Sequence, residues 1–344
     1  MVARLDWGIM GCGWVARDYA GPAIAASGNG CVTALYDPDP ASLARAAALF
    51  PKAVAHADLG AFLATPGLGA AYIAAPNHAH RALAEAAARA GLAVLCEKPM
   101  ATTLADAEAM VAACARAGVR YATAFDQRFH AAHQAMARLI AEGRLGTVTA
   151  VRIVYACWLP ADWAEAGGDN WRIDPKRAGG GALMDLAPHG LDLAATLLGE
   201  PLVSVAAMGQ GRVHHYRVED GAMLIARSRS GVLVQMHVAY NCPETLPRRR
   251  LEVVGTGGQL VAMDTMGQVG GGQLLVLDAA TGVAERMAVP GAERSPFLNQ
   301  AEAFAAAVLG AGEFPFTPQG DLATMRLLLR AQGQAAPPGL SDAA

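Results

Sequence analysis

Residues 5–16 of the chain read Leu5-Asp6-Trp7-Gly8-Ile9-Met10-Gly11-Cys12-Gly13-Trp14-Val15-Ala16. The first six residues form a mostly apolar run of the length of a buried strand, and glycines follow it as in a tight turn. Apolar residues then continue through Tyr19 and Ile24, as in a helix. The stretch therefore predicts a strand, a glycine turn and a helix, which together begin a βαβ unit.

The alternation of strand and helix continues to about residue 126. Apolar runs end at turn residues such as Asp37-Pro38 and Pro76-Asn77, and alanine-rich helical segments separate them. Repeated βα units of this length predict a parallel, doubly wound sheet. The expected strands are 31–36, 70–75, 91–96 and 119–125, and the expected helices are 41–49, 80–90 and 104–117.

The glycine turn has the chemistry of a dinucleotide site. Gly11 permits the tight turn, Gly13 lets the backbone approach a pyrophosphate, and Ala16 takes the small-residue position where helix and strand pack. Asp37 ends the next expected strand, where an acid hydrogen-bonds the adenosine ribose, so we predict NAD in preference to NADP. The turn residues expected at the cofactor are Gly11, Cys12, Gly13, Trp14 and Val15.

After residue 126 the pattern becomes one of hairpins. A helix expected over 131–142 precedes strands at 147–155 and 202–208, and three later strand pairs meet at glycine turns. A chain of 344 residues also exceeds what one core usually serves. We predict an α/β protein with an N-terminal Rossmann dinucleotide-binding domain over 1–126 and, over 127–344, a C-terminal α/β domain for substrate binding and oligomerisation with a large, mostly antiparallel open sheet.

Two further motifs predict hydride-transfer chemistry. Glu97-Lys98-Pro99 follows an apparent strand, where the Lys98 ammonium would lie at a bound nicotinamide and stabilise developing alkoxide charge. Asp185 and His189 are one helical turn apart, so they share a face. His189 is suited to take the hydroxyl proton, and Asp185 would either orient that imidazole or hold Lys98.

Composition excludes several other classes. A formal net charge of -3 gives no basic field for nucleic acid, and no stretch approaches the roughly 20 apolar residues of a membrane span. The six cysteines include no Cys-x-x-Cys pair, so no structural metal is expected. With no apolar leader at the start of the sequence, we expect a cytoplasmic protein.

Four stretches of the chain resemble signatures of the Gfo/Idh/MocA oxidoreductases, the group of glucose-fructose oxidoreductase and inositol dehydrogenase. They are Glu97-Lys98-Pro99, Gly180-Gly181-x-x-x-Asp185-x-x-x-His189-x-x-Asp192, Ala75-Pro76-Asn77-His78-Ala79-His80 and Phe125-Asp126-Gln127-Arg128-Phe129. The resemblance covers nearly the whole chain. It implies an NAD- or NADP-dependent dehydrogenase or reductase that acts on CH–OH groups of a sugar or cyclitol, and an open sheet that forms the subunit interface of a homodimer or homotetramer.

The resemblance also assigns residues. It implies that Lys98, Asp185 and His189 are catalytic. It places at the cofactor Ala75, Pro76, Asn77, His80, Glu97, Lys98, Trp171 and Arg172. The residues expected to bind substrate are Lys98, Arg128, Trp158, Asp169, Asn170, Asp185 and His189.

The chain departs from its relatives in two places. Many relatives carry glycine where this chain has Ala187, and Pro188 withholds one amide from the helix of the Asp/His pair, so the helix is expected to begin late or to bend there. Asp126 stands where a neutral amide is frequent, which puts an acid near the cofactor. Two other functions stay open: a glycoside hydrolase that oxidises the sugar transiently with NAD, and a non-catalytic NAD-binding regulator.

The segment 158–172 is rich in Trp, Asp and Asn. Tryptophan faces pack on the C–H surfaces of sugar rings, and short acids and amides hydrogen-bond their hydroxyls. A phosphorylated or carboxylated substrate would need a cationic clamp, and Arg172 is the only cation of this segment. The composition of the segment therefore favours a polyhydroxylated, largely neutral ring.

Overall fold

A computed structural model describes residues 3–163 and 170–335, which divide into two compact units. The first unit comprises Met1–Ala124 with Phe297–Leu322, and the second comprises Phe125–Pro296 with Ala323–Ala344. The chain therefore enters the first unit twice. The predicted boundary at residue 126 instead assigns every later residue to the second domain.

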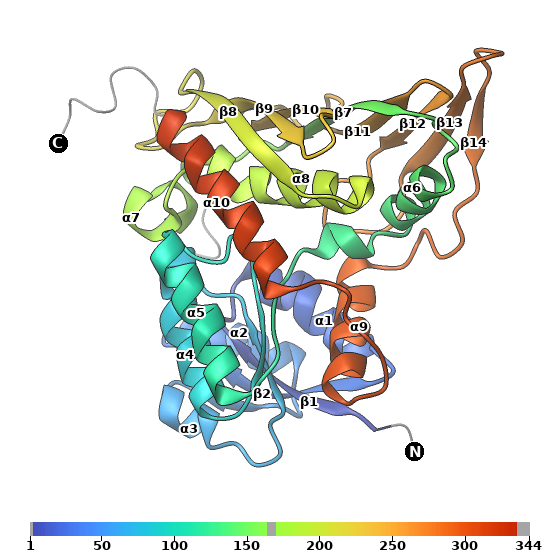
Figure 1. Cartoon of the computed structure of the whole chain (residues 1–344). Helices are drawn as coiled ribbons and strands as arrows, with labels where there is room; N and C mark the ends of the chain where they lie inside the picture. The colour runs from blue at the N-terminus through green and yellow to red at the C-terminus, as the bar shows by residue number, and fades with distance from the viewer. Residues whose placement is uncertain (1–2, 164–169, 336–344) are drawn as a thin grey trace. The chain divides into compact units, whose positions relative to one another are not determined.

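The first unit is built on a six-stranded parallel sheet with the strand order β3-β2-β1-β4-β5-β6. This is the order of a doubly wound dinucleotide-binding sheet. The strands are β1 (Leu5–Met10), β2 (Gly30–Tyr36), β3 (Val54–His56), β4 (Ala70–Ile73), β5 (Ala93–Cys96) and β6 (Tyr121–Thr123). The helices are α1 (Gly21–Ala26), α2 (Pro40–Leu49), α3 (Leu59–Leu63), α4 (His80–Arg89), α5 (Leu104–Ala117) and α9 (Pro296–Val308); Figure 1 shows these elements.

Aromatic contacts explain why Phe297–Leu322 belongs to the first unit. The fully buried rings of Trp7 on β1 and Phe304 on α9 have centroids 5.5 Å apart. Phe297 stacks on Tyr19 at 5.7 Å. Further along, the Asp321 carboxylate accepts a hydrogen bond from the backbone amide of Thr123 at 3.0 Å. These side chains complete the core on which β1 and β6 rest.

The second unit carries an eight-stranded mixed sheet in the order β14-β13-β12-β11-β7-β10-β9-β8. Strands β7 and β10 pair in parallel, and the other neighbours pair antiparallel. The strands are β7 (Val148–Ala156), β8 (Leu202–Gln210), β9 (Gly221–Ser228), β10 (Leu233–Ala239), β11 (Arg249–Gly255), β12 (Gly258–Met263), β13 (Gln273–Asp278) and β14 (Ala284–Met287). The predicted fold class is confirmed.

Helices cover one face of this sheet. The 3-10 segment η3 (Asp126–Phe129) leads into α6 (Ala131–Ala141), and α7 (Pro175–Ala178) precedes α8 (Ala182–Leu198). Helix α8 contacts β7, β8, β9 and β10, and α6 contacts α8 and β12; Figure 1 shows α6 and α8 on the same side of the sheet. Helix α10 (Pro318–Gln334) begins in the first unit and continues in the second.

Two buried histidines link α6 to its surroundings. His133 lies with Nδ1 2.9 Å from the Gln127 carbonyl oxygen and Nε2 2.9 Å from the Thr265 hydroxyl. His130 stacks beside it, with ring centroids 4.7 Å apart. Burial lowers the pKa of His133 to about 3 and that of His130 to about 4, so both rings are neutral in the folded protein.

We expect the two histidines to make the folded protein sensitive to acid. Each histidine has a folded-state pKa below its usual value of 6.5. The stability that its neutral ring contributes to the folded protein is therefore fully present above pH 6.5. It is lost as the pH falls toward about 4 for His130 and about 3 for His133. The free energy of unfolding should decrease by up to about 1.4 kcal/mol per pH unit for each histidine. Urea unfolding between pH 7 and 5 measures this slope. The slope should become shallower in His133→Gln and stay unchanged in the exposed control His215→Gln. Equal slopes in the unsubstituted protein and both variants would contradict the lowered pKa of His133.

Candidate functional site

The glycine turn closes against the next strand of the sheet, as the sequence predicts. Gly11 has a φ of 96°, a conformation that glycine adopts readily, and its amide donates to the Tyr36 carbonyl oxygen at 2.8 Å. A Cβ at position 11 would lie 2.6 Å from the backbone nitrogen of Ala75. The chain then enters η1 (Ala16–Ala20), a single π-helical turn, and continues into α1.

Asp37 lies beside this turn at the end of β2. Its Oδ2 accepts a hydrogen bond from the Cys12 amide at 2.7 Å, and its Oδ1 accepts one from the Asp39 amide at 2.8 Å. The carboxylate is therefore held in place and remains partly exposed. Burial, assisted by Asp37, raises the pKa of the Cys12 thiol to about 12, so this thiol is neutral.

The predicted cofactor residues of the first unit come together at one edge of its sheet. Gly11 follows β1, Asp37 follows β2, Ala75 and Pro76 follow β4, and Lys98 follows β5. In a doubly wound sheet this carboxyl edge, at the point where the strand order reverses between β1 and β4, is where ligands bind. The residues present fit a dinucleotide at this edge, because a tight glycine turn and a fixed carboxylate flank it.

Glu97 is a buried support for the adjacent lysine. Its Oε1 accepts the Tyr72 hydroxyl at 2.6 Å, and its Oε2 accepts the Lys98 amide at 3.2 Å. The Glu97 side chain is 8% exposed, whereas Lys98 is partly exposed and is followed by a cis peptide bond to Pro99. The contacts of Glu97 thus fix the backbone that carries Lys98.

His80 joins two loops of the carboxyl edge. It is fully buried, with Nε2 2.8 Å from the Ala75 carbonyl oxygen and Nδ1 3.0 Å from that of Pro99. Burial lowers the pKa of its imidazole. Both ring nitrogens contact backbone carbonyl oxygens, so the residue holds the loops after β4 and β5 together. A contact of His80 with the cofactor stays a prediction. Asn77, also predicted at the cofactor, is 5% exposed.

In the second unit, α8 carries the predicted Asp/His pair. A buried carboxylate, Glu219, binds the start of this helix: its Oε1 accepts the amides of Gly181 at 2.9 Å and Leu183 at 3.1 Å. An acceptor at this position satisfies amides that have no partner within the helix. The helix begins at Ala182 and continues through Pro188, so the expectation of a late start is wrong.

Asp185 binds a tyrosine from the sheet. Its Oδ2 accepts the Tyr240 hydroxyl at 2.8 Å. Burial, together with the Asp185 charge, raises the pKa of Tyr240 well above its usual value, so the hydroxyl keeps its proton and donates it. Tyr240 directly follows β10 on the same face as Met236 and Val238, a register that the alternation of the strand could have revealed.

His189 lies beside an acid that was not predicted to orient it. Its Nδ1 is 3.4 Å from Oδ1 of Asp126, and both side chains are buried. The imidazole also packs edge-on against Tyr155 of β7, with ring centroids 5.5 Å apart at 73°. Asp185 was predicted either to orient this ring or to hold Lys98. Asp126 was predicted only to lie near the cofactor, and no motif indicated Tyr155.

Arg128 is placed in the interior. Its Nε donates to Asp192 Oδ2 at 2.8 Å, and its Nη2 forms a second, short contact with Asp192 Oδ1. Both side chains are 4% exposed, and the guanidinium lies 4.7 Å from the centroid of the Phe125 ring. Arg128 therefore fixes η3 to α8, and its contact with substrate stays a prediction.

The predicted Trp171-Arg172 pair forms a stacked group. The Arg172 guanidinium carbon lies 4.7 Å from the Trp171 ring centroid and 4.8 Å from that of Trp163, within the range of cation–π attraction. Asn170 is partly buried and its side-chain amide donates to the Pro160 carbonyl oxygen at 3.4 Å. Asp169, also predicted to bind substrate, is outside the described residues.

Trp158 begins a row of aromatic rings in the second unit. Its ring lies 4.6 Å from that of His214, which stacks on Tyr216 at 4.8 Å, and Tyr216 in turn lies 6.5 Å from Tyr240. Trp158 is 39% exposed. His214 and Tyr216 come from the connection between β8 and β9, where no motif in the sequence indicated them.

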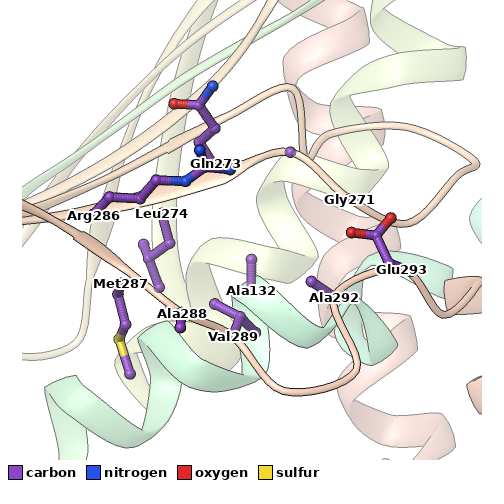
Figure 2. Close-up of a pocket in the computed structure, with 11 residues that line it drawn as sticks. Ala132, Gly271, Gln273, Leu274, Arg286, Met287, Ala288, Val289, Ala292 and Glu293 are labelled. Atoms are coloured by element: carbon purple, nitrogen blue, oxygen red, sulfur yellow. The ribbon is translucent and has the colours of Figure 1, made fainter.

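A separate cavity of about 390 Å³ lies near the β13–β14 hairpin. Figure 2 shows Leu274, Met287 and Val289 gathered beside Ala132 of α6, with Glu293 to one side. None of the predicted site residues that the structure describes lines this cavity.

Two segments of the chain match known domain families. Residues 5–125 match an oxidoreductase family with an NAD-binding Rossmann fold, and residues 133–261 match the GFO/IDH/MocA C-terminal domain. The Rossmann sheet and these matches define an NAD(P)-binding oxidoreductase. The chain belongs to the Gfo/Idh/MocA family, as the sequence motifs indicated.

Individual relatives agree with this assignment. The chain is 36% identical to 1,5-anhydro-D-fructose reductase of Ensifer adhaerens over 268 residues, which is 76% of this chain and 77% of the relative. It is 33% identical to D-apiose dehydrogenase of Paraburkholderia graminis over 263 residues, or 75% and 68% of the two chains. The structure matches the aldose-aldose oxidoreductase of Caulobacter crescentus, crystallised with glycerol, at a TM-score of 0.82 and 26% identity, covering 96% of this chain and 98% of the other. The prediction that the chain is a dehydrogenase or reductase is confirmed.

Among the residues that the structure describes, no helix is both long and apolar enough to cross a membrane.

Proposed function

We propose that the protein transfers a hydride between NAD and a secondary alcohol or ketone carbon of a neutral sugar or cyclitol. The observation that carries the proposal is the position of Lys98 after β5, on the carboxyl edge that also holds the glycine turn and Asp37. The relatives named as a sugar reductase and a sugar dehydrogenase support the substrate class. When bound, NAD supplies the hydride acceptor of the oxidation.

In this proposal three side chains have separate roles in the reaction. The Lys98 ammonium hydrogen-bonds the substrate oxygen and stabilises the negative charge that develops as the hydride departs. His189 takes the hydroxyl proton in the oxidation and returns it in the reduction. Asp185, held by the Tyr240 hydroxyl, accepts a hydrogen bond from the substrate.

Substitution of Lys98 or His189 should therefore affect turnover more than cofactor binding. We expect Lys98→Ala and His189→Ala to lower kcat by about 100-fold or more, the usual scale for electrostatic and proton-transfer groups. NAD affinity, measured by fluorescence titration, should change little. Lys52→Ala and His215→Ala remove exposed residues of the same types and serve as controls. Near-normal turnover in Lys98→Ala would show that this lysine takes no part in the reaction.

Asp37 supports a preference for NAD over NADP. A 2'-phosphate at this position would meet a carboxylate that is fixed by the amides of Cys12 and Asp39. The following residues, Asp37-Pro38-Asp39-Pro40, include no arginine to bind that phosphate.

We accordingly expect kcat/KM to be at least about 10-fold higher with NAD than with NADP, because contact between like charges opposes binding of the phosphate. Asp37→Ser should reduce this ratio, and Asp39→Asn should leave it nearly unchanged because Asp39 caps α2 instead. Steady-state kinetics with both cofactors provide the measurement. Equal or higher specificity for NADP in the unsubstituted protein would refute the preference.

The aromatic groups of the second unit support a neutral ring as substrate. Trp158 offers a partly exposed ring face beside His214, and such faces pack against the C–H surfaces of sugars. Arg172, the only cation of the segment 158–172, is stacked between Trp163 and Trp171. A strongly anionic substrate would require a cationic side chain that is not already engaged by aromatic rings.

A panel of substrates tests the proposed reaction directly. Neutral aldoses, anhydro sugars and cyclitols, each beside its phosphate or uronate, should give NADH formation or consumption mainly with the neutral members. Trp158→Ala should raise KM by about 10-fold, the scale of a lost ring-stacking contact, and Trp158→Phe should restore most of it. A strong preference for the anionic members would contradict the neutral-ring proposal. Glycoside cleavage without net change in NADH would replace it with the hydrolase alternative.

We also propose that the open face of the eight-stranded sheet forms a subunit interface. It carries the exposed apolar side chains of Met208, Met223, Ile225 and Leu233, with exposed fractions of 51% to 79%. Several of them line a shallow apolar hollow of about 420 Å³ on β7, β9 and β10. A contiguous apolar patch of this kind is rarely left in water.

Light scattering should therefore report a dimer or tetramer rather than a 35.4 kDa monomer. Ile225→Asp places a charge in the middle of the patch and should shift the population toward monomer. Leu49→Asp, at an equally exposed position on α2, should not change it. A monomeric unsubstituted protein at working concentration would rule out this interface.

A further inference from the structure

We propose that Asp126 is a positioning residue for His189: its carboxylate holds Nδ1 of the imidazole, so that Nε2 is the atom that exchanges a proton with the substrate hydroxyl. The inference rests on the proposed function, because it assigns an orientation to the proton-transferring group of that reaction.

The Asp126 carboxylate is fixed from its other side. Gln127 Nε2 donates to Asp126 Oδ2 at 2.8 Å and also lies 2.7 Å from the carbonyl oxygen of Gly267. The neighbouring amide is thus bound to both the carboxylate and the loop after β12. Asp126 is only 2% exposed, so Oδ1 is directed at His189 by protein contacts and not by solvent.

The imidazole is fixed as well. His189 is 5% exposed, and the edge-on contact with Tyr155 restricts rotation of the ring. Burial raises the pKa of Tyr155 strongly, so this neighbour stays neutral. One turn later on α8, the Arg128–Asp192 ion pair joins the same helix to the same segment η3. Two successive turns of α8 are therefore held by Asp126-Gln127-Arg128.

The separation of 3.4 Å between His189 Nδ1 and Asp126 Oδ1 is longer than an ordinary hydrogen bond. Contacts of this type are frequently long before substrate binds and shorten in the complex. A carboxylate accepts hydrogen bonds only, so the proton of a neutral His189 resides on Nδ1 when the two groups engage. Nε2 then has the lone pair that a general base requires.

The proton and electron balance of the oxidation follows from this arrangement. The carbinol C–H bond breaks and its hydrogen leaves with the electron pair as a hydride, which NAD would accept when bound. The O–H bond breaks, its proton moves to Nε2, and its electron pair forms the C=O bond. The resulting imidazolium carries a positive charge beside the Asp126 carboxylate, which stabilises it; in the reduction every step runs in reverse.

The structure places the Asp126 carboxylate against the His189 ring, and the other groups near α8 are the following. On its own helix, Asp185 binds Tyr240 and Asp192 binds Arg128. From α6, the ring of His133 is neutral. From the sheet, β7 presents neutral Tyr155, and β10 presents the apolar side chains of Met236 and Val238 on its buried face.

Kinetics of Asp126→Asn and Asp126→Glu test the proposal in the full-length protein. We expect Asp126→Asn to lower kcat by about 10- to 100-fold, with KM and NAD affinity changed by less than about 3-fold. The acidic limb of the pH profile of kcat/KM for the oxidation should move about one unit lower, because a neutral amide no longer favours the charged imidazole. Asp126→Glu, which restores the charge, should recover much of the rate and of the profile.

Asp192→Asn is the matched control. It removes a similarly buried carboxylate from the adjacent turn of α8, so it should lower thermal stability through the loss of the Arg128 pair. Because the Asp126 carboxylate is retained in this variant, the acidic limb should keep its position even where a shift of α8 lowers kcat. If Asp126→Asn shows an unshifted limb and a kcat within about 2-fold of the unsubstituted protein, the proposal is overturned.

A measurement that needs no activity separates this inference from the proposed function. ¹⁵N NMR of histidine-labelled protein, with the His189 signal assigned by its absence in His189→Gln, reports which ring nitrogen carries the proton. The proton should be on Nδ1 in the unsubstituted protein, and Asp126→Asn should lose that preference. The same tautomer in both proteins would overturn the positioning role even if the enzyme is active. A protein inactive on all sugars but with the expected tautomers would instead refute the proposed function alone.

Discussion

The buried ion pair between Arg128 and Asp192 is the interaction on which the arrangement of the second unit depends. Two charged side chains, each 4% exposed, meet in the interior through a two-point contact. Burial of such charges is costly, and removal of one partner typically destabilises a protein by about 3–5 kcal/mol. The pair therefore permits little variation in the register of η3 against α8, and the position of His189 follows from that register.

The same helix is fixed at its beginning by Glu219. A buried carboxylate in place of a local cap connects the start of α8 to the residues just before β9. Burial raises the pKa of this carboxyl group, and the two amide donors offset part of the cost of its charge. Pro188 removes one hydrogen bond from the middle of the helix. The contacts of Glu219 compensate for this loss in the hydrogen bonding within α8.

Much of this structure was predictable from the sequence because strand ends and glycine turns are local signals. Helix α5 was expected over the residues that it occupies, and the carboxyl edge of the first sheet was identified from Gly11 and Asp37. The contacts of Arg128 and His80 were not predictable, because a sequence motif identifies a residue but not the residues that contact it. The strand β3, only three residues long and mostly exposed, has too few apolar positions to be recognised.

The return of the chain to the first unit has a consequence for how the protein can be divided. Residues 297–322 supply Phe304 against Trp7 and the Asp321 carboxylate at Thr123. A gene fragment that stops near residue 126 therefore encodes a Rossmann sheet that lacks the core residues contributed by 297–322. Truncation, fusion or exchange of this unit between relatives has to carry two separate segments of the coding sequence, joined by a linker in place of the second unit.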